Sequence, residues 1–213
     1  MAVAVKICGV NSVEAAEAAT AAQYVGFVFY PPSPRAVSAE TAATLAVHLP
    51  DTVTRTGLFV DAEDAAIAAV LARTPLDLLQ LHGEESPERI AEVREKFGLP
   101  VMKAIKVATK TDVDAAAAYF SCADHLLFDA RPPATMEDAL PGGNALAFDW
   151  GLLAGRDWPL PWMLSGGLRV ENLAQAVRIS GASVVDVSSG VEFASGHKNP
   201  AFIRAFIDEA AKL

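Results

Sequence analysis

The sequence predicts an α/β fold, a single closed (β/α)8 TIM barrel of the phosphate-binding type that takes up residues 1–213 as one domain. Short runs of valine, isoleucine, leucine and phenylalanine alternate along the chain with alanine- and glutamate-rich segments of helical character. Eight such units follow one another without a linker or a break in composition. Pairs of serine and glycine follow the last two runs, where barrels of this type often hold a phosphate.

The expected strands are nearly continuous in apolar residues, as in a parallel sheet covered by helices. They are residues 3–8, 24–29, 52–60, 76–81, 101–107, 125–128, 162–164 and 184–187. An open doubly wound sheet is the alternative. That fold usually has a glycine-rich turn after its first strand, whereas Gly9 stands alone there.

Capping residues mark the starts of the expected helices. Two expected N-caps are followed three residues later by an acidic residue: Asn11 with Glu14, and Thr109 with Asp112. Ser38 and Asp61 are expected to cap their helices alone. Two further helices are expected to begin with proline, at Ser86-Pro87 and Asn199-Pro200.

Composition excludes several classes of protein. A hydrophobic content of 52% excludes disorder, and no apolar run reaches the roughly 18 residues of a membrane helix. No signal peptide is expected, because Lys6 interrupts the early apolar residues. A net charge of −9 argues against nucleic acid as a partner, since binding it requires a basic stripe. Cys8 and Cys122 are too few for a disulfide framework and fit the reducing cytoplasm.

The first expected strand ends in a lysine and a thiol on one face. Residues two apart share a face, so Lys6 and Cys8 point to one side while Val3, Val5 and Ile7 point to the other. The carboxyl ends of the strands form the active-site face of a TIM barrel, which places Cys8 at its mouth.

Asp129 closes the sixth strand, across the mouth from Cys8, and this separation suits an acid and a base that act on one substrate. The structural alternatives are a buried thiol for Cys8 and a helix cap or turn for Asp129. An expected phosphate site on the same face favours catalytic roles for both residues.

That phosphate site consists of Ser165-Gly166-Gly167 after the seventh strand and Ser188-Ser189-Gly190 after the eighth. Glycine lets the main chain approach an anion closely, and serine hydroxyls and free N–H groups bind it. Either pair alone is ordinary turn chemistry. Together, in the last two units of the chain, they predict a ligand that carries a phosphate.

Other expected site residues also follow strands. The proline-stiffened loop 30–35 presents Arg35, while His82 follows the fourth strand and Asp186 lies in the eighth. His82 either contacts the substrate or binds neighbouring backbone, and both alternatives stay open. The segment from Asp129 to about residue 148 has no periodic pattern. A loop this long that starts on the catalytic face is expected to be a lid rather than a plain surface loop.

Six motifs carry a resemblance that runs from Val5 to the C-terminal helix. They are Lys6-Ile7-Cys8-Gly9, Gly26-Phe27-Val28-Phe29-Tyr30 leading to Ser33-Pro34-Arg35, Gln80-Leu81-His82-Gly83, Phe148-Asp149-Trp150, Leu164-Ser165-Gly166-Gly167-Leu168 and Val185-Asp186-Val187-Ser188-Ser189-Gly190-Val191-Glu192. In this order they resemble the phosphoribosylanthranilate isomerase family of tryptophan biosynthesis. Ala145 and Leu146 depart from the family, which often has a further glycine and a polar residue there.

The resemblance implies an intramolecular oxidoreductase of the aldose–ketose isomerase type. It would convert N-(5-phosphoribosyl)anthranilate to 1-(2-carboxyphenylamino)-1-deoxyribulose 5-phosphate by an Amadori rearrangement. The implied general base is Cys8, the general acid is Asp129, and the ligand of the anthranilate carboxylate is Arg35. The implied phosphate ligands are Gly166, Gly167, Ser188, Ser189 and Gly190, and His82 and Asp186 are counted as substrate-binding residues.

The family also implies the surroundings of this reaction. No metal or organic cofactor is expected, and the only expected partner is a small phosphorylated substrate, with no nucleic acid and no membrane. The expected location is the cytoplasm, and monomer and homodimer both stay open. The length leaves no room for the indole-glycerol-phosphate synthase domain that some members carry fused.

Cys8 needs help to act as a base, because only about 3% of an ordinary cysteine is thiolate at pH 7. Lys6 is the nearest cation that would lower the pKa of the thiol. Closure of the barrel sets the eighth strand beside the first, so we expect Lys6 and Asp186 to form a buried ion pair. The alternative is a lysine whose stem packs while its amine reaches water.

Two other functions share the phosphate site. Another sugar-phosphate barrel enzyme is one: a ribulose-phosphate epimerase would have histidine and aspartate metal ligands at its strand ends, and an indole-glycerol-phosphate synthase would have a catalytic lysine with glutamates. A non-catalytic barrel that binds a phosphorylated ligand is the other, because a fold does not establish an activity.

Overall fold

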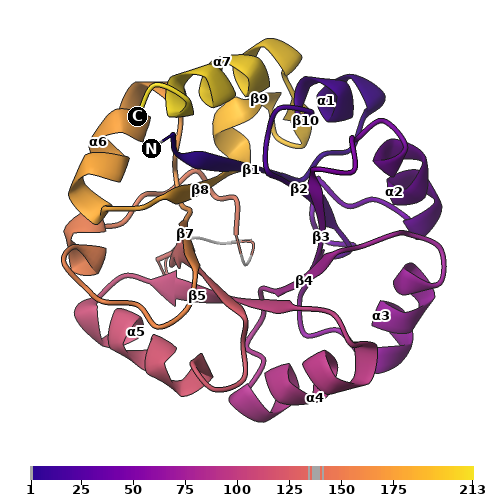
Figure 1. The fold of residues 1–213 in the computed structure, drawn as a ribbon, viewed down its shortest axis with the longest axis horizontal. Helices are drawn as coiled ribbons and strands as arrows, with labels where there is room; N and C mark the ends of the chain where they lie inside the picture. Colours follow the sequence, from indigo (N-terminus) through magenta and orange to yellow (C-terminus); the bar gives the residue numbers. More distant parts are fainter. Residues whose placement is uncertain (1, 134, 136–139, 141) are drawn as a thin grey trace.

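The computed structural model describes residues 2–133, 135, 140 and 142–213. Eight parallel strands close into a barrel in sequence order, with the eighth paired to the first, and helices surround it (Figure 1). The strands are β1 (Ala4–Cys8), β2 (Tyr24–Val28), β3 (Thr54–Phe59), β4 (Leu78–Leu81), β5 (Val101–Val107), β6 (His125–Ala130), β7 (Trp162–Leu164) and β8 (Val184–Val187). The predicted TIM barrel is confirmed, and each strand lies within two residues of its expected ends.

The α-helices are α1 (Val13–Ala18), α2 (Ala39–Ala46), α3 (Asp64–Leu71), α4 (Pro87–Phe97), α5 (Lys110–Asp114), α6 (Val170–Ser180) and α7 (Pro200–Ala210). Short 3-10 turns are η1 (Ala115–Tyr119), η2 (Trp150–Leu153) and η3 (Ser189–Val191). A small antiparallel hairpin of β9 (Glu192–Ala194) and β10 (His197–Lys198), which the sequence pattern did not predict, precedes α7.

The sixth unit departs from the expected strand–helix alternation. Within its described residues, η2 takes the place of an α-helix between β6 and β7. Pro132 and Pro133 remove two backbone donors from this segment, and Gly142 and Gly143 disfavour helix formation.

Most expected helix starts are confirmed: Ser38, Ser86 and Asn199 cap their helices, and Thr109 with Asp112 forms a capping box. Two expected caps are wrong. Ser12 rather than Asn11 caps α1, and Glu63 rather than Asp61 precedes α3.

These two residues have other hydrogen-bond partners. The Asn11 amide donates to the carbonyl of Gly196 in the β9–β10 hairpin. Asp61 has a left-handed backbone (φ 47°), and its carboxylate accepts the N–H of Glu84.

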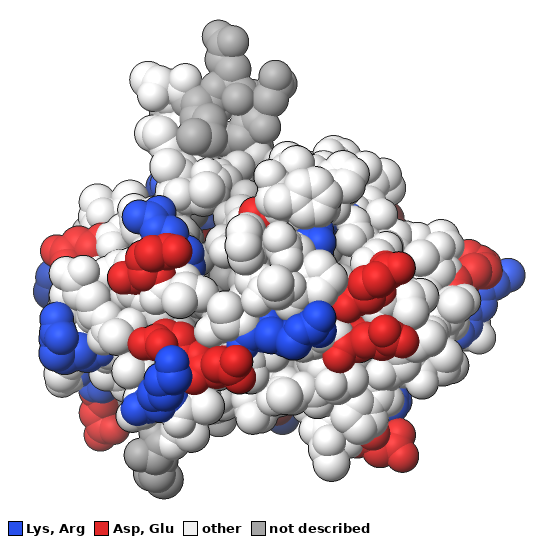
Figure 2. Space-filling view, turned by 90° about the horizontal axis from the view of Figure 1, so that it is seen from above, with Lys and Arg blue, Asp and Glu red and all other residues white. Residues whose placement is uncertain are grey.

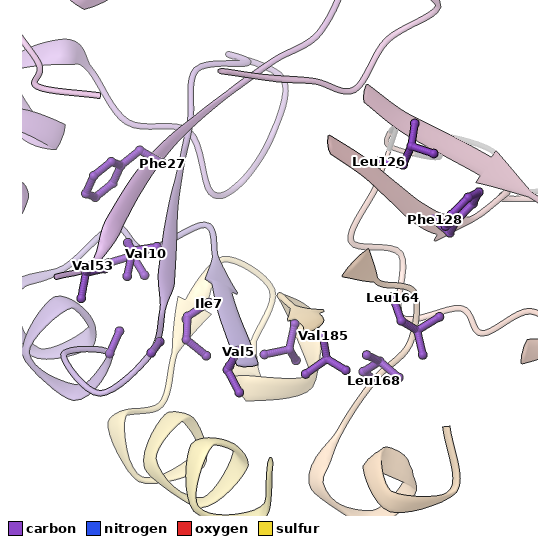
Figure 3. Packing of buried hydrophobic residues seen from close by; sticks show 14 of the residues in the cluster. Val5, Ile7, Val10, Phe27, Val53, Leu126, Phe128, Leu164, Leu168 and Val185 are labelled. Carbon is purple, nitrogen blue, oxygen red and sulfur yellow. The ribbon is translucent and has the colours of Figure 1, made fainter. Parts of the chain in front are cut away.

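Alternation along the strands separates two apolar layers. Val5, Ile7 and Val185 point outward and pack in the layer between the strands and the helices (Figure 3). Inward-facing side chains of β4 to β7 fill the barrel itself, namely Leu78, Met102, Ala104, Leu127 and Met163. The barrel interior is therefore packed below the mouth, and the open space lies at the carboxyl ends of the strands.

The outer surface carries charges of both signs, which are interspersed on the face that Figure 2 shows. The two ends of the chain lie near each other (Figure 1), and the Val3 N–H donates to the carbonyl of Ala210 in α7. None of the helices in the described part of the chain is long and apolar enough to cross a membrane.

Candidate active site

A cavity of about 710 Å³, part of it open to solvent, lies at the carboxyl ends of the strands. All expected site residues except Gly190 line it: Cys8, Arg35, His82, Asp129, Gly166, Gly167, Asp186, Ser188 and Ser189. Gly190 lines the neighbouring hollow, which Gly167 and Ser189 also line. One site therefore brings together residues that lie up to 181 positions apart in the chain, namely Cys8 and Ser189.

Cys8 and Lys6 share the inward face of β1, as alternation predicts. Both are buried, and Gly26 on β2 makes room for them, since a β-carbon there would lie 3.1 Å from Cys8 Sγ and 3.3 Å from Lys6 Nζ. Lys6 Nζ donates to Asp186 Oδ1 at 2.7 Å, across the register that pairs the two residues. The predicted buried ion pair is confirmed, and the alternative of a lysine that reaches water is wrong.

The environment of Cys8 works against its ionisation. Burial raises the pKa of the thiol, and the Asp186 carboxylate adds to the rise, while the ammonium groups of Lys6 and Lys198 lower it. Lys6 therefore lowers the pKa of Cys8 as expected, but burial raises this pKa by more. Burial also disfavours the ammonium of Lys6, yet Asp186 and Cys8 hold the pKa of Lys6 above its usual range.

Asp129 lies near the end of β6 with its carboxylate buried. Oδ1 accepts the N–H of Ala130 at 2.9 Å, and Oδ2 lies 3.2 Å from His82 Nε2, although these two atoms are not aligned as a hydrogen bond. His82 Nδ1 lies 2.8 Å from the side-chain amide of Gln80. The His82 side chain therefore lies between the expected acid and the side chain of Gln80.

Arg35 also lines the cavity and is held by Glu192. Its Nε and Nη2 donate to the two carboxylate oxygens of Glu192 at 2.7 and 2.9 Å, and Nη2 also donates to the carbonyl of Gly143 at 3.2 Å. This fork occupies one edge of the guanidinium. Nη1 lies on the other edge of the guanidinium, beside Gly143 of the expected lid.

The expected phosphate loops come close together because of their glycines. Gly166 and Gly167 have left-handed backbones (φ 89° and 61°), which other residues rarely adopt. A β-carbon on Gly190 would lie 1.9 Å from the carbonyl oxygen of Leu168, so only glycine lets the loops after β7 and β8 approach this closely. Gly190 thus shapes the cradle between these loops.

The described part of the expected lid lies over the site. A β-carbon on Gly142 would be 2.7 Å from Asp129 Oδ2, and one on Gly143 would be 2.6 Å from Arg35 Nη1. Residues 134, 136–139 and 141 of this loop lie outside the described residues. Ala145 has a left-handed backbone (φ 57°), a conformation that explains the glycine often found here in the resembled family.

Sequence reasoning missed two parts of the site. The first is an apolar wall formed by Val28, Leu58, Val60 and Leu146. Val28 and Leu58 lie at the carboxyl ends of β2 and β3, so the rule that found Cys8 and Asp129 would also have found them. The second part is the ionic support of Arg35, in which Glu192 also binds Lys198. No periodic pattern marks the short hairpin that holds these two residues.

The whole barrel corresponds to one known family. The sequence matches the family described as N-(5'-phosphoribosyl)anthranilate (PRA) isomerase over residues 5–209. The chain belongs to this family. Curated isomerases of that name from Paramagnetospirillum magneticum and Rhodospirillum centenum are 56% and 57% identical to it. These matches cover 99% and 100% of this chain and 98% and 100% of the two relatives.

Solved structures of phosphoribosylanthranilate isomerases have the same fold. The enzyme from Thermotoga maritima has a TM-score of 0.86 and 38% identity, over 99% of this chain and 100% of the other. A further structure of a family member, in complex with reduced 1-(o-carboxyphenylamino)-1-deoxyribulose 5-phosphate, has a TM-score of 0.83 and 36% identity, with the same coverage. The predicted family and its isomerase class are therefore confirmed.

Proposed function

We propose that the chain converts N-(5'-phosphoribosyl)anthranilate to 1-(2-carboxyphenylamino)-1-deoxyribulose 5-phosphate in tryptophan biosynthesis. The observation that carries this proposal is the shared cavity of Cys8 and Asp129. Arg35 and two glycine-rich loops line the same cavity, and these groups suit a substrate with a carboxylate and a phosphate.

Asp129 and Cys8 divide the proton transfers of this rearrangement. Asp129, in its protonated form, donates a proton to the ring oxygen of the ribose while the bond from that oxygen to C1 breaks and an imine forms. Cys8, as thiolate, then takes the proton from C2, which gives an enolamine. Tautomerisation of the enolamine to the ketone adds a proton at C1 and removes one from the C2 hydroxyl, and proton exchange with solvent returns Cys8 to the thiolate and Asp129 to the acid. Substrate and product therefore have the same composition.

The rest of the cavity binds the two ends of the substrate. The guanidinium of Arg35 would bind the anthranilate carboxylate, and the main chain around Gly166, Gly167 and Ser189 would bind the phosphate. The apolar wall, with Leu58 as one member, suits the aromatic ring. Asp186 supports the site from below, because its two oxygens accept hydrogen bonds from Lys6 and Ser165 at 2.7 and 2.9 Å.

The competing sugar-phosphate chemistries fit these residues less well. A synthase reaction would need a lysine that is free to act in the cavity. Lys6 and Lys103, the buried lysines of the barrel strands in the described part of the chain, are paired with Asp186 and Glu85 at 2.7 and 2.6 Å. Neither lysine lines the cavity.

A coupled fluorescence assay on phosphoribosylanthranilate tests this function. We expect steady turnover by the purified chain and none above background with ribulose 5-phosphate or with the substrate of the synthase. Absence of turnover of phosphoribosylanthranilate, or turnover of one of the other two substrates alone, would overturn the proposal.

We further propose that the chain acts as one domain, in the cytoplasm and without a metal or organic cofactor. Pairing of β8 with β1 supports one domain, and the presence of Cys8 and Cys122 as free thiols suits a reducing compartment. Monomer and homodimer stay open as assembly states, and light scattering on the purified chain distinguishes them.

A further inference from the structure

Glu192 and Lys198 form a second buried ion pair beside the cavity. They face each other across the β9–β10 hairpin, and Lys198 Nζ lies 2.7 Å from Glu192 Oε1. Their side chains are only 4% and 0% exposed. Taking two charges out of water is unfavourable unless further hydrogen bonds compensate, so the other partners of this pair are informative.

Glu192 binds Arg35, which lines the cavity. Its two oxygens accept from Nε and Nη2 of Arg35, at 2.7 and 2.9 Å, in a fork that fixes the plane of the guanidinium. The fork decides which edge of Arg35 faces the substrate. Without it, the contact of Nη2 with the carbonyl of Gly143 would remain.

Lys198 binds Ser188, which also lines the cavity. Its Nζ donates to the backbone carbonyl of Ser188 at 2.9 Å and to the Ser188 hydroxyl at 3.2 Å. Ser188 has an irregular backbone (φ −124°, ψ −81°) and begins the loop that carries Ser189 and Gly190. Lys198 therefore holds the start of the phosphate loop in place.

Charge balance also favours an anion beside Arg35. Arg35 and Lys198 carry two positive charges and Glu192 carries one negative charge, so the cluster has one positive charge in excess. A carboxylate bound to Arg35 would offset this excess positive charge.

We propose that Glu192 and Lys198 are positioning residues, which fix the guanidinium of Arg35 and the phosphate loop at Ser188 at one set separation. This fixed separation selects a substrate whose carboxylate and phosphate lie the same distance apart. The inference rests on the proposed function, because it assumes that Arg35 binds the carboxylate.

The test compares Glu192→Gln and Lys198→Met with a matched control, Glu85→Gln. Glu85 forms an equally buried pair with Lys103, at 2.6 Å and with both side chains 3% exposed, but does not line the cavity. Binding of anthranilate and of inorganic phosphate is measured by calorimetry, and thermal unfolding is recorded for each variant. These measurements do not depend on turnover. They therefore test the positioning roles, while the assay on phosphoribosylanthranilate tests the proposed activity separately.

We expect each variant to weaken one probe. Glu192→Gln should weaken the binding of anthranilate about 10-fold or more and change the binding of phosphate less than about 2-fold. Lys198→Met should weaken the binding of phosphate about 10-fold or more and change the binding of anthranilate less than about 2-fold. The two effects should combine non-additively in affinity for reduced 1-(o-carboxyphenylamino)-1-deoxyribulose 5-phosphate. Glu85→Gln should lower the unfolding temperature and leave both probes unchanged.

Equal effects of the Glu192 and Glu85 variants on both probes would overturn the inference, because they would show a purely structural pair. Lys198→Arg retains the charge and serves where Lys198→Met does not fold. With this variant we expect phosphate binding within about 3-fold of the original chain. If Lys198→Arg weakened the binding of anthranilate more than that of phosphate, this would count against the assignment of Lys198 to the phosphate loop.

Discussion

Lys6 Nζ lies 2.7 Å from Asp186 Oδ1, and both side chains are shut away from water inside the barrel. The pair lies directly beneath Cys8, and Asp186 also accepts a hydrogen bond from Ser165, which precedes the first phosphate glycine. It therefore joins the first and the last two strands under the site. Removal of one partner would leave an uncompensated buried charge.

Loss of Lys6 should accordingly destabilise the fold. We predict that Lys6→Met lowers the free energy of unfolding by about 3–5 kcal/mol, as measured by urea denaturation. The double variant Lys6→Met, Asp186→Leu removes both charges and should recover most of this loss. A decrease below about 1 kcal/mol in the single variant would contradict the buried pair.

The thiol of Cys8 should titrate above the ordinary cysteine value of about 8.5, because burial raises its pKa. Thiolate absorbance, followed against pH and compared with Cys8→Ser, measures it. Lys6→Met should raise this pKa further, since the ammonium of Lys6 favours the thiolate. Titration of Cys8 below about 8 would disprove this prediction.

The same shift affects stability at alkaline pH. The folded chain favours the neutral thiol, so the contribution of Cys8 is fully present below about pH 8.5 and is lost as the pH rises through the folded pKa. The raised pKa of Lys6 has the same sign, because its charged form is favoured in the folded state. We therefore predict a fall in the unfolding temperature above about pH 9, smaller in Cys8→Ser.

A glycine of the phosphate cradle can be tested against a matched glycine elsewhere. Gly167 and Gly98 have nearly equal left-handed φ values, 61° and 64°. A β-carbon at Gly167 would lie 2.7 Å from the Leu146 backbone of the lid, whereas one at Gly98 would have no neighbour within 4 Å. Both changes to alanine should destabilise by about 1–2 kcal/mol through backbone strain.

Only Gly167→Ala should also raise KM, by about 10-fold or more, because its new methyl group must displace the lid or the loop. Steady-state kinetics of both variants decides this. An equal KM in Gly167→Ala and Gly98→Ala would show that the approach of the lid to Gly167 has no part in binding.

The pattern of the sequence predicted the barrel and its mouth because both follow from local rules. Alternation along β1 placed Lys6 and Cys8 inward, and the carboxyl-end rule brought Asp129 to the same cavity as Cys8. Closure of the barrel then predicted the Lys6–Asp186 pair. Each of these inferences needs only the order and the period of the strands.

Features that depend on long-range geometry could not be predicted in this way. The Arg35–Glu192 fork joins residues 157 positions apart, through a two-stranded hairpin that is too short for a periodic pattern. Asp61 was expected to cap a helix, because its residue type favours caps, but its left-handed backbone directs it to Glu84. The raised pKa of Cys8 results from the degree of its burial, which neighbouring charges in the sequence do not reveal.

The most direct test of the catalytic pair is kcat for Cys8→Ala and for Asp129→Asn on phosphoribosylanthranilate, with thermal unfolding as a check of the fold. We predict that each substitution lowers kcat by about 10²–10⁴-fold while the fold persists. Because the two groups act in successive proton transfers on one substrate, neither variant should retain useful turnover. A folded Cys8→Ala or Asp129→Asn variant with the turnover of the original chain would contradict the account.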